Sequence, residues 1–278
     1  MSRRATVPSS PVARRSPAAI AFMGPWFERF FRRHMGGLRL ARWGLPDASA
    51  GPLVVYSNHP GWWDVVVYAL LARRLLPGYE GYGPIDAAML KKYGFFERIG
   101  LFGIEPDSPR GAAAFLRAAA DILSKPDRML MLTAQGRFAD PRERPLGLRP
   151  GVARLAEVAP DARFLPLAVE YAFWTERGAE ALAAFGPPLR AADLLALPRR
   201  ERLARLEEAL SASMDRLAAD AIARDPARFT SLLFRRGSGF TFSPQSVARS
   251  HLPCRLAVVG VKPSRWRVIC TTLETHPR

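Results

Sequence analysis

The sequence predicts an α/β fold, with a mixed central sheet flanked by helices, and an amphipathic N-terminal helix that precedes this domain along the chain. Two observations support this prediction. The chain has 278 residues, of which 49% are hydrophobic, and this is enough to fill one large core. Short apolar runs of strand length also alternate along the chain with longer segments of helical periodicity.

Three apolar runs have the length of buried strands: 53–57 (LVVYS), 129–132 and 164–169. The first lies between Gly51-Pro52 and an Asn-His-Pro-Gly stretch, which indicates a strand that enters a sharp turn. Helices are predicted at 62–76, 110–123 and 199–223. Asp225-Pro226 ends the last of them, because a residue before proline disfavours the helical conformation.

The N-terminal region contains a helix with two chemically different faces. From Trp26 onward, a step of about 100° per residue gathers aromatic and apolar side chains in one half of the wheel and arginines in the other. The aromatic half holds Trp26, Phe27, Phe30, Phe31, His34, Met35 and Leu38. This helix, from near Pro25 to Gly36-Gly37, suits the plane of a membrane interface. Packing of the aromatic half onto the protein's own domain is the alternative.

The net charge of +16 is concentrated at the two ends of the chain. Residues 1–45 hold nine arginines against one acidic residue, and residues 235–278 hold eight basic residues against one acidic residue, which leaves only +1 in the middle. A neutral body with basic ends fits an anionic membrane surface better than a nucleic-acid groove, so nucleic acid is not an expected partner. The arginine-rich composition of a GC-rich genome is the alternative explanation.

These patterns divide the chain into a disordered arm (1–17), an amphipathic membrane-surface helix (18–45), an α/β domain (46–236) and a tail of unknown role (237–278). Cys254 and Cys270 lie in the tail without the spacing of a zinc site, which favours a reducing, cytoplasmic location. No apolar run has the length of a membrane span, and no signal-peptide pattern is found. We therefore expect a protein that is peripheral on the inner face of the cell membrane.

His59 and Asp64 are the candidate catalytic pair. His59 comes directly after the strand 53–57, and histidine is the side chain best matched to proton transfer near neutral pH. A turn led by Pro60-Gly61 can fold the Asp64 carboxylate back onto the imidazole, where it would fix the tautomer. The nearest hydroxyl, that of Ser57, is on the strand. We therefore expect His59 to take a proton from a substrate hydroxyl, without a covalent enzyme intermediate.

The stretch 58–64, NHPGWWD, resembles the His-four-residues-Asp (HX4D) motif of the glycerolipid acyltransferase superfamily, which includes lysophosphatidic-acid acyltransferases. Residues 133–138 (TAQGRF) resemble that family's Phe-Pro-Glu-Gly-Thr-Arg block, 148–156 the basic segment after it, and 165–167 (LPL) its fourth block. The resemblance covers roughly residues 50–190. It implies that 46–236 is an acyltransferase domain of phospholipid biosynthesis, in which the pair deprotonates an acceptor hydroxyl for attack on an acyl thioester.

The acceptor end departs from the family's pattern. Gln135 replaces a glutamate, Arg137 stands where Thr or Ser is usual, and the block at 103–107 lacks its arginine, the nearest one being Arg110. Arg137, Arg142, Arg144 and Arg149 are candidates for an alternative anion site, since guanidinium groups suit phosphate, and Arg137 and Arg149 are the preferred two. The other interpretation is that these arginines only cover a surface loop. The expected substrate-binding residues are Asn58, Gly61, Arg110, Gln135, Gly136, Arg137 and Arg149. Backbone amides near Gly61 or Gly136 are candidates to hold the oxyanion.

The resemblance implies that the donor is acyl-CoA or acyl carrier protein, that the acceptor is a lysolipid, and that neither a metal nor a bound cofactor takes part. Two other functions remain open. A thioesterase or hydrolase with the same pair would use water as the acceptor, and a non-catalytic basic lipid-binding protein would show no turnover.

Overall fold

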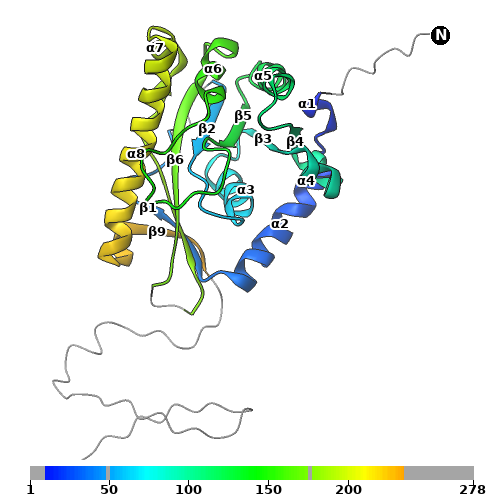
Figure 1. The fold of residues 1–278 in the computed structure, drawn as a ribbon. Helices are drawn as coiled ribbons and strands as arrows, with labels where there is room; N and C mark the ends of the chain where they lie inside the picture. The colour runs from blue at the N-terminus through cyan, green and yellow to red at the C-terminus, as the bar shows by residue number, and fades with distance from the viewer. Residues whose placement is uncertain (1–9, 48–50, 175–176, 235–278) are drawn as a thin grey trace, which may run out of the picture. The chain divides into compact units, whose positions relative to one another are not determined.

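A computed structural model describes residues 10–47, 51–174 and 177–234 (Figure 1). All of these residues belong to one compact unit, Met1–Phe240. The predicted tail 237–278, with Cys254 and Cys270, lies outside the described residues.

A mixed nine-stranded sheet forms the centre of this unit, as the sequence predicts. Its order is β4-β3-β5-β2-β6-β7-β1-β9, and β8 pairs with β6. The strands from β4 to β6 in this order are parallel, β7 is antiparallel to β6, β1 is parallel to β7, and β9 is antiparallel to β1. The bounds are β1 (Gly37–Ala41), β2 (Leu53–Ser57), β3 (Glu80–Asp86), β4 (Leu101–Ile104), β5 (Arg128–Thr133), β6 (Arg163–Ala172), β7 (Glu180–Phe185), β8 (Leu189–Arg190) and β9 (Phe229–Phe234).

Helices cover both faces of the sheet, and alternation along β2 shows how the two cores form. Val54 and Tyr56 pack in a core with residues of α5, α6 and α8, whereas Leu53 and Val55 pack on the other face with α2 and α3. Figure 1 shows α8 and α2 at opposite sides of the sheet. The helices are α1 (Pro11–Arg14), α2 (Pro17–His34), α3 (Asp64–Leu75), α4 (Ala87–Lys92), α5 (Pro109–Ile122), α6 (Gly151–Val158), α7 (Ala191–Leu195) and α8 (Arg199–Ala223), with 3-10 turns η1 (Gly94–Ile99) and η2 (Pro226–Arg228).

The N-terminal region differs from the prediction. The amphipathic helix α2 begins at Pro17, where the Ser16 hydroxyl accepts a hydrogen bond from the Ala19 amide, and it ends at His34, before Gly36. Residues 37–41 are not helical but form β1, between β7 and β9, so the α/β body begins before residue 46.

Part of the predicted disordered arm is also structured. Residues 11–14 form α1, and the next arginine, Arg15, forms an ion pair with Glu80 of β3 over 3.0 Å. The Ser10 hydroxyl bonds to the Asp121 carboxylate of α5. These contacts hold the described end of the arm against the domain.

Candidate functional site

Three parallel strands end side by side at the candidate site. Ser57 of β2 is in register with Thr133 of β5 and with Leu167 of β6. The residues that follow Ser57 and Thr133 therefore meet at the carboxyl edge of the sheet, next to the part of β6 that follows Leu167. This edge is where open α/β sheets bind their ligands.

His59 and Asp64 are in direct contact, as the sequence predicts. His59 Nδ1 lies 2.5 Å from Asp64 Oδ2, and the Gly61 amide donates to the same oxygen over 3.3 Å. Asp64 is the first residue of α3 and its side chain is only 1% exposed, whereas that of His59 is 20% exposed. An ionised Asp64 selects the tautomer of His59 that carries its hydrogen on Nδ1. Nε2 is then left to accept a proton from a substrate.

Tyr171, near the end of β6, completes this arrangement and was missed in the sequence. Its hydroxyl donates to Asp64 Oδ1 over 2.5 Å, so both carboxylate oxygens accept hydrogen bonds. Burial, together with the nearby charge of Asp64, raises the pKa of Tyr171, so its phenol stays protonated and acts as a donor. The available signal was the period of two in Leu167, Val169 and Tyr171, which puts Tyr171 on the same face as the apolar residues of β6.

The side chains of Asn58 and Gln135 hold the backbone of the turn that carries His59. Both are buried, and the Asn58 carboxamide exchanges two hydrogen bonds with the backbone of Val169, at 2.8 and 2.9 Å. Gln135 Oε1 accepts from the His59 amide, and its Nε2 donates to the Leu146 carbonyl, each over 3.0 Å. These hydrogen bonds give both side chains a positioning role, and their predicted part in substrate binding stays a prediction.

This geometry predicts the effect of restoring the family's glutamate at position 135. In Gln135→Glu, a buried carboxylate would face the Leu146 carbonyl without a hydrogen to donate, and we expect a loss of about 1–3 kcal/mol in the free energy of unfolding. A protonated carboxyl can still donate, so the loss should be smallest at acidic pH and grow as the pH rises. Urea unfolding at pH 4 and pH 7 measures this. Equal stability of the wild type and Gln135→Glu at pH 7 would contradict the role of Gln135 in joining the His59 amide to the Leu146 carbonyl.

The candidate anion-binding arginines are all paired with exposed carboxylates. Arg137 pairs with Glu143, Arg142 with Asp140, Arg144 with Asp215 and Arg149 with Asp107. Such exposed pairs are worth little, so an anionic ligand can displace them at a small cost. The four arginines thus pair with four different carboxylates, and their part in anion binding stays a prediction.

Arg149 is nevertheless close to the turn that holds His59. Gly136 has a φ of +64°, and a Cβ atom there would lie 3.0 Å from Arg149 Nε, so this side chain lies against the turn. Arg110 is exposed in the first turn of α5, and no contact places it with the other site residues. The amides proposed for the oxyanion have internal acceptors: Gly61 donates to Asp64, and Gly136 to the Thr133 carbonyl over 3.2 Å.

Exposed aromatic side chains lie beside the pair. The ring of Phe138 is centred 4.3 Å from that of His59, and Phe138 is 60% exposed. Trp62, which is 62% exposed, contacts Phe30 of α2, and Phe30 stacks on Trp26 at 5.2 Å. An aromatic surface therefore continues from the His59 turn onto α2.

Within the described residues, no group of three or more His, Cys, Asp or Glu side chains is arranged to hold a metal ion, and no helix has the length and apolarity to cross a membrane. No protein-family model matches the chain, and no curated protein matches its sequence. The assignment of a function therefore depends on the chemistry of the site.

Proposed function

We propose that this protein is an acyltransferase that moves a fatty acyl group from acyl-CoA or acyl carrier protein to a hydroxyl of a lysophospholipid-like acceptor. The observation that supports this most is the contact between partly exposed His59 and buried Asp64 at the carboxyl edge of the sheet. The order of residues in the 58–64 stretch and its resemblance to the glycerolipid acyltransferases give the reaction class.

The proposed reaction is a direct transfer. The acceptor hydroxyl gives its proton to His59 Nε2 while its oxygen bonds to the thioester carbonyl carbon. Asp64 stabilises the imidazolium that forms, and Tyr171 and the Gly61 amide hold Asp64 in place. The carbon–sulfur bond then breaks, and the imidazolium returns the proton to the leaving thiolate. The products are the acylated lipid and a free thiol.

A screen of acceptors tests this function and identifies the substrate. Radiolabelled acyl-CoA and acyl carrier protein are incubated with lysolipids that have either glycerol phosphate or amino-acid headgroups, and the products are separated. We expect labelled diacyl lipid with one of these acceptors. Labelled free fatty acid without a lipid product would identify a hydrolase, and no turnover with any acceptor would favour a lipid-binding protein.

We further propose that the protein docks on the anionic inner face of the cell membrane through the aromatic surface of α2 and the His59 turn. Phe27 and Phe31 are buried against the domain, but Phe22 of α2 is 72% exposed, and Trp26 and Trp62 are also exposed. Arg29 and Arg33 are exposed on the same helix. Exposed aromatic side chains with arginines next to them suit a headgroup layer.

The docking proposal predicts weaker vesicle binding when exposed aromatic residues are removed. For Phe22→Ser with Trp62→Ser, we expect at least a 10-fold loss of affinity for phosphatidylglycerol vesicles in cosedimentation, since burial of even one large apolar side chain is worth about 1.5–3 kcal/mol. Binding should also weaken as salt is added. Leu195→Ser, which removes an exposed apolar side chain from α7, is the control. Equal binding by the double variant and this control would contradict docking through this surface.

A further inference from the structure

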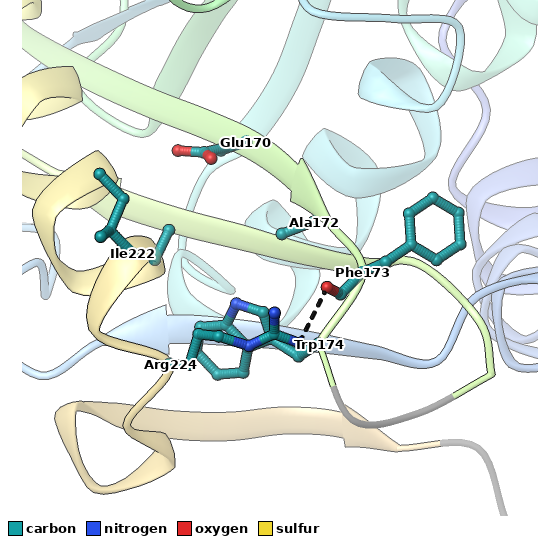
Figure 2. Close-up of a pocket in the computed structure, with 7 residues that line it drawn as sticks. Glu170, Ala172, Phe173, Trp174, Ile222 and Arg224 are labelled. Carbon is teal, nitrogen blue, oxygen red and sulfur yellow. Dashed lines mark hydrogen bonds between the residues drawn. The ribbon is translucent and has the colours of Figure 1, made fainter. Parts of the chain in front are cut away.

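A shallow cavity of about 250 Å³, largely open to solvent, lies beyond the end of β6, on the face of the sheet opposite to Tyr171 (Figure 2). Its lining comes from the end of β6 and the end of α8: Glu170, Ala172, Phe173, Trp174, Ala221, Ile222 and Arg224. Figure 2 shows the Glu170 carboxylate at one end, the Arg224 guanidinium at the other, and the Phe173 ring turned away from both. The proposed acyl transfer at His59 does not use this cavity.

The Glu170 carboxylate is half-buried and has no hydrogen-bond or ion-pair partner among the residues that the structure describes. Burial raises its pKa, while the charges of Arg142 and Asp140 act on it in opposite directions. Arg142 is itself bonded to Asp140 at 2.7–2.9 Å. Glu170 therefore has no directly bonded cation among the described residues, and a ligand can supply one.

Arg224 ends α8 with a φ of +50°, a conformation in which glycine is the usual residue. Its guanidinium donates one hydrogen bond, from Nη2 to the Phe173 carbonyl over 3.2 Å. A guanidinium has five N–H donors, so others are left for an anionic ligand. Glycine would end the helix with less backbone strain than an arginine at this positive φ, so the helix end alone does not explain the arginine.

The two charged ends are separated by an apolar stretch. The Arg224 guanidinium is hydrogen-bonded to the Phe173 carbonyl. Phe173 follows Glu170 by three residues, so the backbone positions of the two lie roughly 10 Å apart if the chain is extended. Ala172, Ala221 and Ile222 line the space between them. We propose that this cavity binds a small zwitterion, with a primary ammonium on Glu170, a phosphate on Arg224, and a short carbon chain between them.

Phosphoethanolamine is the probe for this proposal, because it has both charged groups on a two-carbon chain. Isothermal titration of the full chain should show binding at least 10-fold tighter than that of ethanolamine or inorganic phosphate, which each have one group. Phosphocholine, which has no N–H, should also bind at least 10-fold more weakly. Vesicles with phosphatidylethanolamine or phosphatidylcholine then distinguish a lipid headgroup from a free solute as the source.

Two variants separate binding from folding. Glu170→Gln removes a poorly solvated charge, and Arg224→Gly places glycine at a positive φ, so neither should lower the melting temperature. Each should weaken phosphoethanolamine binding at least 10-fold. The raised pKa of Glu170 makes the wild type less stable as the pH rises, so any gain in melting temperature from Glu170→Gln should appear at pH 7 and vanish at acidic pH.

Arg200→Gln and Glu201→Gln are the matched controls, because they remove the same charges from exposed positions at the other end of α8. Both should bind phosphoethanolamine like the wild type. The proposal is overturned if free phosphoethanolamine binds no tighter than phosphate or ethanolamine and, in addition, phosphatidylethanolamine vesicles bind no tighter than phosphatidylcholine vesicles. It is also overturned if Glu170→Gln and Arg224→Gly bind it like the wild type. None of these measurements depends on acyl transfer.

Discussion

The variants His59→Ala and Asp64→Asn are each expected to lower the rate of acyl transfer by about 10³- to 10⁴-fold, which is the size of effect seen when such a proton-transfer pair is broken. His59→Ala removes the group that accepts the proton. Asp64→Asn keeps the shape of the side chain but no longer requires a hydrogen on Nδ1, so the productive tautomer of His59 is lost. Turnover of labelled acyl-CoA with the acceptor found in the screen measures both effects.

These losses must be distinguished from unfolding, because Asp64 is buried among hydrogen-bond donors. Circular dichroism and the melting temperature of each variant provide this check. Asp193→Asn, at an exposed site on α7 where Asp193 pairs with Arg190, is the matched control and should keep full activity. Near-normal activity of either His59→Ala or Asp64→Asn would refute the role given to that residue.

Phe31→Ala is expected to destabilise the protein by about 3–5 kcal/mol, a large part of the stability of a typical domain. Phe31 is almost fully buried where α2 packs against the sheet and α3, and its loss leaves a cavity there. Phe22→Ala, on the exposed side of the same helix, should change stability by no more than about 0.5 kcal/mol. Urea unfolding measures both values, and similar stabilities would contradict the packing of α2.

This packing also limits what truncation can test. Deletion of residues 1–45 would remove α2 and also β1, which lies between β7 and β9 in the sheet. Loss of vesicle binding by such a protein would then report unfolding. Substitutions of exposed residues such as Phe22 and Trp62 avoid this difficulty.

The parts of the fold that the sequence predicts are those with a strong local signal. Residues 53–57 are apolar, partly β-branched and bounded by turn residues, and they form β2 with the predicted ends. The apolar residues of 199–223 recur at helical spacing, and this segment forms α8. The strands around 129–132 and 164–169 are confirmed too, although β5 and β6 are longer than the apolar runs.

The missed strands have sequences that do not favour strands locally. β7 (EALAAF) is rich in alanine, which favours helices, and β3 (EGYGPID) contains glycine and proline. β1 contains Arg39, an unusual residue for a buried strand. Its charge is compensated by Glu180 of β7, which is distant in the sequence. Tertiary pairing therefore decides these elements.

The same division holds for the candidate site. His59 and Asp64 are five positions apart, so a single turn is enough to join them, and the sequence could indicate this. Tyr171 and Gln135 reach the pair from β6 and from the turn after β5, through a strand register that one sequence does not reveal. The partners of Arg137 and Arg149 likewise depend on how the loops fold.

The release of free CoA from acyl-CoA at increasing acceptor concentration tests the central claim most directly. If His59 deprotonates an acceptor hydroxyl for direct transfer, thiol release should be negligible without acceptor, rise to saturation as acceptor is added, and match the acylated lipid one to one. Release of CoA at the full rate without acceptor, together with free fatty acid or a labelled protein, would contradict direct transfer.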